Sequence, residues 1–403
     1  MIKDLDNNSA VVTHYLQNKD NEFSKHFKKE ALQIISSYKE NAIHNEMLNI
    51  VAEDPFQQHL FEFENIPFPA PKNYNFKFID LFAGIGGFRI AMQNNGGKCV
   101  FTSEWVKEAQ KTYKANFGEV PFGDITKEET KKYIPNNFDI LCGGFPCQPF
   151  SAAGIQKGFD DTRGTLFFDI LEILNTKKPK VVLLENVRNL LYHNQGKTFK
   201  TMIKHLEDLG YLVSWEVLNA KDFGVAQTRE RIVIVGTKKK KFDFSKIKKT
   251  KKNASIKDVI NEEDEKNYKY LSPSEYILIP DEHIKVQATG LKFIGYRDKP
   301  IRATGVRPNT EHLSRVHRQC NRIYSTDGTH PTIASTEISG RHHIYHNGKV
   351  RKLTINECFR LMGFPKKYVK VSSTADLYRQ IGNSVAIPMI EAVTEQIIEQ
   401  GFV

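Results

Sequence analysis

The sequence predicts an α/β protein with a Rossmann-like, mostly parallel sheet and a smaller, irregular second domain. Two observations lead to this fold class. Between residues 76 and 237, apolar runs of strand length alternate with segments of helix length, as in parallel sheets covered on both faces. From residue 238 to 349 this rhythm is lost, and lysine runs, turn pairs and short polar strands replace it. We therefore expect an inserted second domain there.

Residues 1–75 stand apart from this pattern. Apolar residues recur at helical spacing from Phe27 to Ala42 and predict an amphipathic helix, which Met47, Leu48 and Val51 extend. The proline-rich run 67–71 interrupts helix and strand alike and predicts a linker. We expect a small helical extension that packs on the main body, and the sequence favours no particular function for it.

The elements of the large domain follow in order. Strands are expected at residues 76–82, 99–104, 138–142, 181–184, 213–218 and 231–235. Helices are expected at residues 87–93, 107–117, 166–174 and 198–209. Regular patterning returns with a capped helix within 353–362 and a last helix over 387–400, so residues 350–403 are expected to rejoin the large domain.

Composition narrows the class of protein. Among 403 residues, 58 are Lys or Arg and 47 are Asp or Glu, which gives a formal net charge of +11. This surplus favours a polyanionic partner, most commonly nucleic acid, although a lysine-rich composition without function is an alternative on charge alone. The five cysteines form no CxxC pair, which argues against a disulfide framework and a zinc site, and for a reducing compartment.

The sequence also lacks targeting signals. The N-terminus has no apolar core of signal-peptide length, and no run of 18 apolar residues occurs. Neither secretion nor a membrane span is therefore expected. We expect a monomeric cytoplasmic protein, associated with the nucleoid if its partner is DNA, and no metal site.

A glycine turn, Gly84-Ile85-Gly86-Gly87, follows the first expected strand. Its glycines would let a ligand approach the backbone, and the helix that begins there favours polar or anionic groups. The spacing departs from the dinucleotide fingerprint, which has a third glycine. Glu104, about 20 residues further on, could accept hydrogen bonds from ribose hydroxyls.

Two more residues complete this predicted pocket. Trp105 offers a flat face to an adenine ring, with an ordinary core aromatic as the alternative. Asp124 could accept a hydrogen bond from an adenine amino group, although the sequence from Asp124 to Glu128 is also typical of a helix N-cap. Ribose, adenine and no required pyrophosphate fit S-adenosylmethionine better than a dinucleotide.

Cys147 follows an apolar strand and a Gly-Gly turn, with prolines on both sides. Such a cysteine is held away from the sheet, with the exposure that a nucleophile needs. Glu185 closes the expected strand 181–184, so both groups are expected at one edge of the sheet. A buried structural thiol is the alternative for Cys147, and a surface or capping role is the alternative for Glu185.

A thiolate beside a carboxylic acid suits a ring that must be attacked and protonated together, as in methylation of cytosine at carbon 5. Thiolate addition to carbon 6 makes carbon 5 nucleophilic, and hydrogen bonding or protonation at N3 eases that addition. We assign Cys147 as the nucleophile and Glu185 as the acid at N3. Because a free cysteine has a pKa of about 8.5, positive charge is needed nearby. Arg229 and Arg231 are the candidates, with simple ion pairs as their alternative role.

These motifs, Gly143–Ser151, Glu185–Val187 and Leu353–Pro365, resemble in order those of the C5-cytosine DNA methyltransferases of bacteria and phages. The resemblance extends from about Phe76 to Val403. It implies an S-adenosylmethionine-dependent catalytic domain over 76–237, a target recognition domain over 238–349, and arginines 229 and 231 lining the target pocket. With the two glycines of the turn, the implied cofactor residues are Phe82, Gly84, Gly86, Glu104, Trp105, Asp124, Ile125, Leu166, Asn383 and Ser384.

The same resemblance points to contacts with double-stranded DNA. Residues 315–335 match the family's segment that crosses the recognition domain, and residues 152–164 are expected to form a mobile loop that closes over a flipped cytosine. The lysines between Lys238 and Lys252 could bind phosphates, or belong to a solvated linker. The expected DNA contacts are Gln148, Ser151, Gln319, Arg322, Tyr324 and Thr332.

We therefore predict a DNA (cytosine-5-)-methyltransferase that uses S-adenosylmethionine and acts on a flipped cytosine in a short duplex motif. One alternative substrate is tRNA, on which one branch of the family acts. Another alternative is a DNA-binding regulator without catalysis. The recognised motif, and whether a cognate restriction endonuclease acts separately on it, are left open by the sequence.

Overall fold

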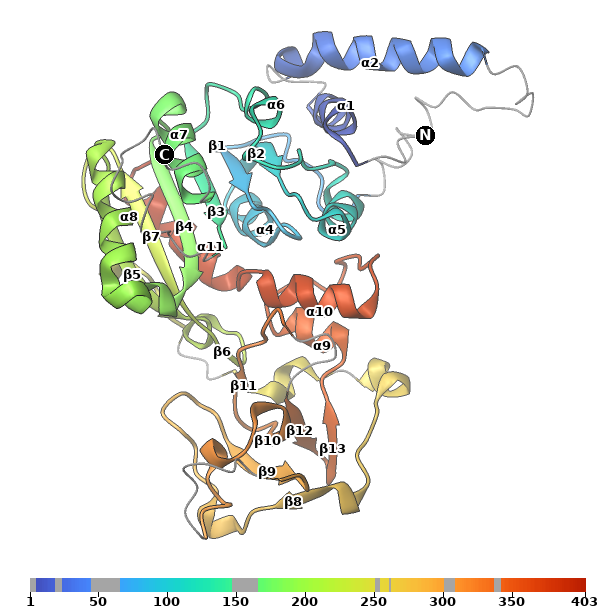
Figure 1. The fold of residues 1–403 in the computed structure, drawn as a ribbon, viewed down its shortest axis with the longest axis vertical. Helices are drawn as coiled ribbons and strands as arrows, with labels where there is room; N and C mark the ends of the chain where they lie inside the picture. Colours follow the sequence, from blue (N-terminus) through green and yellow to red (C-terminus); the bar gives the residue numbers. More distant parts are fainter. Residues whose placement is uncertain are drawn as a thin grey trace.

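The computed structural model describes residues 5–18, 24–44, 66–146, 166–250, 254–260, 262–300, 309–336 and 342–403. A larger sheet with its covering helices, a smaller sheet apart from it, and two N-terminal helices against the larger body make up the molecule (Figure 1). Cys147, Gln148, Ser151 and the segment 152–164, for which predictions were made, lie outside the described residues. In the described part, no helix has the length and apolar character needed to cross a bilayer.

A six-stranded sheet forms the centre of the larger body, in the order β2-β1-β3-β4-β7-β5. Its strands are β1 (Phe76–Leu81), β2 (Gly97–Ser103), β3 (Ile140–Gly144), β4 (Val181–Val187), β5 (Leu212–Asn219) and β7 (Glu230–Thr237). The pairings β1–β2, β1–β3 and β3–β4 are parallel, whereas β7 is antiparallel to both β4 and β5. The sheet is therefore mixed, because a short connection returns the chain from β5 directly into β7.

Helices cover both faces of this sheet, as the alternation within β4 shows. Val181 and Leu183 join the hydrophobic core formed with α4, α5 and α11. Val182 and Leu184 join the other core, formed with α7 and α8. Burial on both faces explains the continuous apolar run of this strand. The helices of this body are α4 (Gly87–Asn94), α5 (Lys107–Phe117), α6 (Glu128–Lys131), α7 (Leu166–Lys177), α8 (Lys197–Asp208) and α11 (Ile387–Glu399).

The smaller sheet has five strands in the order β13-β12-β10-β9-β8. They are β8 (Tyr276–Leu278), β9 (Phe293–Arg297), β10 (Arg322–Ser325), β12 (His343–His346) and β13 (Lys349–Lys352). Ile323 packs with Ile294 and Val350 in one small core of this sheet. Because β13 pairs with β12 through Lys352, the predicted boundary at residue 350 cuts a strand, and the return to the large body begins after it.

The segments between the two sheets join them. α9 (Ile355–Arg360) and α10 (Thr374–Asn383) lie there, as do the paired short strands β6 (Gln227–Thr228) and β11 (His330–Pro331) (Figure 1). The predicted capped helix is α9, in which Thr354 and Glu357 form a capping box. Glu357 also accepts two hydrogen bonds of 2.8 Å from the buried guanidinium of Arg351, so the end of β13 is fixed to the start of α9.

The lysine cluster after β7 does not reach the predicted site. In the antiparallel register Thr237 pairs with Val181, whereas Glu185 pairs with Val233. The cluster thus begins at the end of the sheet opposite Glu185, about 13 Å away along the strand. Lys248 pairs there with Glu399 at 2.9 Å. These contacts favour an intramolecular role over the phosphate contacts considered from the sequence.

Two buried histidines of the smaller domain predict acid sensitivity. Burial lowers the pKa of His330 and of His343 to about 4. Both are therefore neutral in the folded protein but take up a proton when unfolded below pH about 6.5. Stability should fall as the pH drops from 6.5 towards 4, by about 2 kcal/mol per histidine at pH 5.

Urea unfolding at pH 7 and pH 5 measures this effect. In a His343→Gln variant, the loss of unfolding free energy between the two pH values should be smaller than in the wild type by about 2 kcal/mol. His283→Gln, at an exposed position, should leave the loss unchanged. An equal loss in the wild type and in His343→Gln would contradict the assignment.

The N-terminal extension contains two helices, α1 (Asn7–Gln17) and α2 (Ser24–His44). The sequence predicted α2, but α1 was missed. Ala10 and Val11 of α1 are fully buried in the same core as Val182 and Leu184 of the sheet. The extension is therefore packed on the large body.

Candidate active site

The carboxyl ends of the parallel strands bring the predicted catalytic segments together. Gly143 pairs with Leu81 of β1, and Gly144 pairs with Glu185 of β4. A methyl group on Gly144 would lie 3.4 Å from Glu185 Oε2. The chain that leads to Cys147 therefore leaves the sheet directly beside Glu185.

Glu185 is an almost buried carboxyl group, with 7% of its surface exposed. Arg231 Nε lies 2.9 Å from Glu185 Oε1 as an ion pair. Burial raises the pKa of Glu185, against the opposing positive charges of Arg231 and Arg229. A carboxyl group with a raised pKa is suited to donate a proton near neutral pH.

The residue after the acid fixes the local backbone. Asn186 Nδ2 donates a 2.8 Å hydrogen bond to the carbonyl of Phe145, and Asn186 Oδ1 accepts one from Val187 N. The end of β4 is thus attached to the segment two residues before Cys147. This contact explains why an asparagine follows the acid.

Three of the four described cysteines are unsuited to nucleophilic attack. Cys99, Cys142 and Cys358 are buried, and Cys320 is exposed in the smaller domain. Burial raises the pKa of Cys142 well above its ordinary value, and the nearby carboxyl of Asp80 adds to the shift. Cys142 therefore remains a protonated structural thiol.

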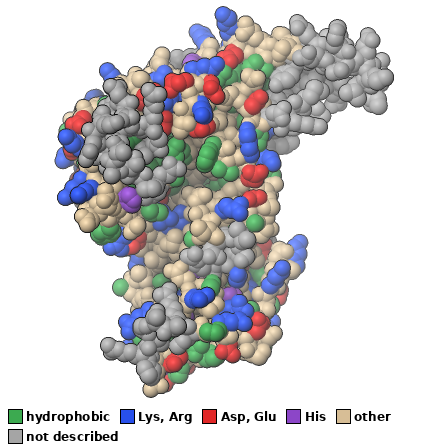
Figure 2. Space-filling view, in the orientation of Figure 1, with side chains coloured by type: hydrophobic (Ala, Val, Ile, Leu, Met, Phe, Trp, Pro, Cys, Tyr) green, Lys and Arg blue, Asp and Glu red, His purple; other side chains and the backbone are tan. Residues whose placement is uncertain are grey.

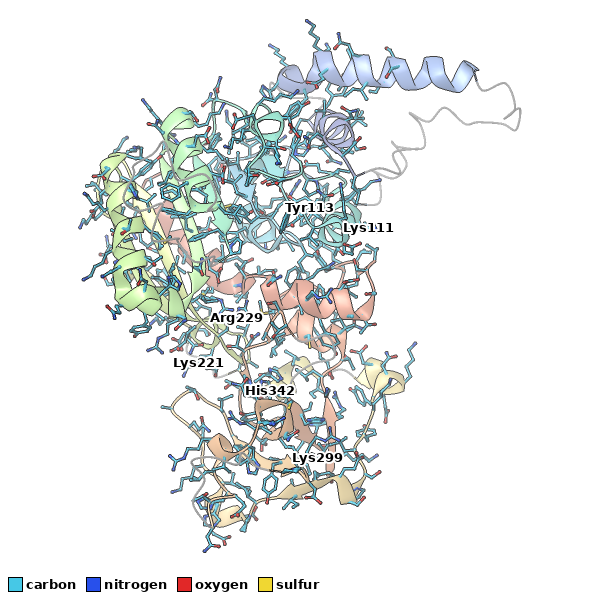
Figure 3. All side chains as sticks on the ribbon, viewed as in Figure 1. Lys111, Tyr113, Lys221, Arg229, Lys299 and His342 are labelled. Atoms are coloured by element: carbon cyan, nitrogen blue, oxygen red, sulfur yellow. The ribbon has the colours of Figure 1, made fainter. Side chains whose placement is uncertain are left out.

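Arg229 is fully buried and lies between the two sheets (Figure 3). It donates hydrogen bonds to the carbonyls of Ile333 at 3.0 Å, Gly382 at 2.9 Å and Ser384 at 2.6 Å. These acceptors lie 104 to 155 residues away in the chain. In this structure Arg229 therefore joins residues 315–335 to the end of α10. Its positive charge acts on the pKa of Glu185 only as a longer-range electrostatic interaction.

Removal of Arg229 should destabilise the protein. An Arg229→Ala variant would leave three carbonyl groups without their donor and should lower the free energy of unfolding by about 3 kcal/mol. Chemical denaturation measures the loss. Arg379→Ala, which removes an exposed pair with Asp376, is the control and should cost below about 1 kcal/mol. Equal losses in both variants would contradict the anchoring role.

The glycine turn has one open side. Phe82, Gly84 and Gly86 all have positive φ, at 57°, 55° and 80°. A methyl group on Gly87 would lie 2.8 Å from Ser384 Oγ, whereas one on Gly84 would meet nothing within 4 Å. The turn is therefore packed against the C-terminal segment at Gly87 and open at Gly84, where a ligand can approach the backbone.

Glu104 and Trp105 follow β2 beside this turn. Glu104 accepts hydrogen bonds of 2.8 Å from the backbone N–H groups of Gly84 and Val106. Each carboxylate oxygen has a second lone pair, so ribose hydroxyls remain possible donors. Trp105 is 70% exposed, which excludes the alternative that it is a core aromatic.

Asp80 is a residue of this pocket that sequence reasoning missed. It is fully buried in β1, and its Oδ2 accepts no hydrogen bond among the described residues. Burial raises its pKa to about 8, although the charge of Arg89 opposes this shift. The available signal was an acidic residue within the apolar run Phe78–Leu81, because a buried acidic group needs a partner.

The other predicted cofactor residues lie on several elements. Asp124 Oδ1 accepts a 3.0 Å hydrogen bond from Thr126 N, but the N-cap of α6 is Lys127, so Asp124 does not cap that helix. Ile125 is buried, Leu166 begins α7, and Asn383 ends α10. Ser384 follows α10 and faces Gly87 of the glycine turn.

The predicted DNA contacts differ in their exposure. Gln319 is exposed, and Arg322 is partly buried and donates to the carbonyl of His317. Thr332 donates a 2.7 Å hydrogen bond to the carbonyl of Thr228. Tyr324 is 1% exposed and packs with Phe293, so its side chain belongs to a core of the smaller domain and not to the predicted DNA surface.

Comparisons with known proteins identify the family. A family model described as C-5 cytosine-specific DNA methylase matches residues 76–399. The chain is 47% identical over 359 residues to Type II methyltransferase M.HpaII of Haemophilus parainfluenzae, covering 87% of this chain and 96% of that protein. It is 40% identical over 332 residues to Type II methyltransferase M.HhaI of Haemophilus parahaemolyticus, covering 80% and 94%.

Solved structures support the fold. The S. pombe Dnmt2 methyltransferase has a TM-score of 0.56 at 19% identity and is covered completely by 81% of this chain. The Entamoeba histolytica methyltransferase EhMeth has a TM-score of 0.55 at 17% identity, with 82% and 99% covered. At these identities the likeness concerns the α/β methyltransferase fold.

Proposed function

Because the chain belongs to the C-5 cytosine-specific DNA methylase family, we propose that it methylates carbon 5 of a flipped cytosine through a covalent adduct with Cys147. The chain is a DNA (cytosine-5-)-methyltransferase and uses S-adenosylmethionine. The observation that carries the mechanistic part is Glu185, a buried acid held by Arg231 beside the strand end that leads to Cys147.

The proposed reaction begins with the Cys147 thiolate, which adds to carbon 6 of the cytosine. Glu185 donates a proton to N3 as the C5=C6 double bond breaks, and the resulting enamine is nucleophilic at carbon 5. After methyl transfer, a base removes the carbon 5 proton, the thiolate leaves carbon 6, and N3 returns its proton. Arg231 holds the Glu185 carboxyl in place, and Arg229 fixes the backbone behind it.

The pocket beside the glycine turn fits S-adenosylmethionine, which supplies an electrophilic methyl group when bound. The open side at Gly84 and the unpartnered Oδ2 of buried Asp80 support this fit. We propose that Trp105 stacks on the adenine, that Glu104 accepts hydrogen bonds from the ribose, and that Asp80 Oδ2 accepts a hydrogen bond from the amino group of the cofactor. Phe82, Gly86, Asp124, Ile125, Leu166, Asn383 and Ser384 would line the remainder of the pocket.

We propose that duplex DNA binds between the two bodies, with the smaller sheet as target recognition domain. Lys and Arg side chains occur on both bodies on the face in Figure 2, as phosphate contacts require. Of the predicted contacts, Gln319 is exposed and Arg322 is partly exposed, and Gln148 and Ser151 are proposed from the sequence. A monomer would act at the nucleoid, independently of any restriction endonuclease.

A methyl-transfer assay tests this function. Labelled S-adenosylmethionine is incubated with the enzyme and either duplex DNA or tRNA. We expect 5-methylcytosine in the DNA and none in the tRNA. Label in tRNA alone would replace the proposed substrate, and label in neither polymer from folded protein would favour a regulator without catalysis.

A further inference from the structure

We propose that helix α1 of the N-terminal extension is a positioning element of the cofactor site, an inference that rests on the function proposed above. The segment from Glu119 to Ile125, here called the adenine segment, ends in Asp124, expected at the adenine amino group, and Ile125, which is proposed to line the cofactor pocket. Side chains of α1 hold this segment in place. The extension precedes residue 76, where the family match begins, so this role lies outside the domain that the family model describes.

Two side chains of α1 accept hydrogen bonds from backbone amides of the segment. Asn7 Oδ1 accepts from Gly123 N at 3.0 Å, directly before Asp124. Thr13 Oγ1 accepts from Val120 N at 3.0 Å, and both of these residues are fully buried. A buried amide that loses its acceptor is costly, so α1 stabilises one backbone path for this segment.

A buried charge cluster links α1 to the helix that follows the glycine turn. His14 Nε2 lies 3.6 Å from Glu119 Oε2. Glu119 accepts two hydrogen bonds from the guanidinium of Arg89, at 2.5 and 3.1 Å. Arg89 lies on α4 and also donates a hydrogen bond of 3.0 Å to the hydroxyl of Tyr113 of α5. All three members of the cluster are fully buried, so α1, the segment and α4 form one packed unit.

The opposite side of the segment is attached to β2. Phe122 N donates to the carbonyl of Thr102 at 2.9 Å, and Glu104 N donates to the carbonyl of Phe122 at 2.8 Å. The ring of His14 lies 4.9 Å from that of Phe122. The segment is therefore held between α1 and the end of β2, so a shift of α1 would move both the adenine residues and Glu104.

Helix α2 holds α1 against this unit. Phe27 of α2 is buried and lies 5.6 Å from the His14 ring and 5.9 Å from the Phe122 ring. Glu30 accepts a 2.6 Å hydrogen bond from the hydroxyl of Tyr133. The extension thus covers the outer side of the adenine segment, and its contribution to the site is the rigidity of that segment.

Isothermal titration of the full chain with S-adenosylmethionine tests this role. Asn7→Ala and Thr13→Val should each weaken cofactor binding about fivefold, the effect of one lost hydrogen bond on a pre-formed site. The loss should appear in KM for the cofactor rather than in kcat. Asn7→Asp and Thr13→Ser, which keep the acceptor oxygens, should restore the wild-type Kd.

Asp6→Ala is the matched control. Asp6 caps α1 through Ser9 N but does not contact the segment, so this variant tests helix stability alone and should bind within twofold of the wild type. Hydrogen exchange of the Val120 and Gly123 amides should rise in Asn7→Ala and Thr13→Val. Wild-type affinity in both variants, or equal weakening in Asp6→Ala, overturns the inference. A wild type that binds no S-adenosylmethionine overturns the proposed function instead.

Discussion

A Cys147→Ser variant is expected to lower kcat for methyl transfer by about 10⁴-fold or more, the usual cost of removing a covalent nucleophile. A serine hydroxyl is far less acidic than a thiol and adds poorly to carbon 6, so carbon 5 stays unreactive. Single-turnover transfer from labelled S-adenosylmethionine to duplex DNA measures the loss. Binding of DNA and cofactor should be retained, because the two side chains have similar size.

The matched control for this substitution is Cys320→Ser, at an exposed cysteine of the smaller domain. Its kcat should stay within about twofold of the wild type, as expected of a surface substitution. A Cys147→Ser variant as active as this control would remove the covalent step from the mechanism. That result would also remove the proposed role of Glu185, which is to protonate N3 during the addition of the thiolate.

A Glu185→Gln variant is expected to lower kcat by about 10²- to 10³-fold, within the range of a positioned general acid. Glutamine keeps the shape and can donate a hydrogen bond to N3, but it cannot transfer a proton. The pH profile should change as well. Burial raises the pKa of Glu185, so the wild type should lose activity on the alkaline side as this acid deprotonates, and the variant should lack that decline.

Glu230→Gln is the control for this second prediction, since Glu230 begins the neighbouring strand β7 but forms a surface ion pair with Arg188. Its rate and its pH profile should match those of the wild type. If Glu185→Gln retains both the rate and the alkaline decline, another group must act at N3.

The sequence was informative wherever one strand determined the environment of a residue. Gly144 ends β3, and Glu185 lies near the end of the neighbouring parallel strand β4, so their pairing followed from strand positions alone. The apolar run 181–184 likewise indicated a strand that is buried on both faces, and its residues lie alternately in the two hydrophobic cores. The position of Trp105 could also be predicted from its strand, because Trp105 follows Glu104 directly after β2. Its high exposure agrees with a stacking role.

Features that depend on distant segments could not be predicted. Arg229 donates hydrogen bonds to carbonyls more than 100 residues away. The sequence therefore could not show whether this arginine holds distant backbone segments together or contacts the target base. Helix α1 has few large apolar residues, and its burial depends on packing against the sheet. Tyr324 lies on the short strand β10, and the sequence could not show which face of the smaller sheet is covered.

Bisulfite sequencing of DNA from cells that express the chain, beside cells that express a Cys147→Ala variant, tests the central claim most directly. We predict protected cytosines at one position of a single short motif with the wild type, and none with the variant. That result would establish the reaction, the nucleophile and the recognised sequence together. Equal protection in both samples, or no protection by folded wild-type protein, would contradict methylation of DNA through Cys147.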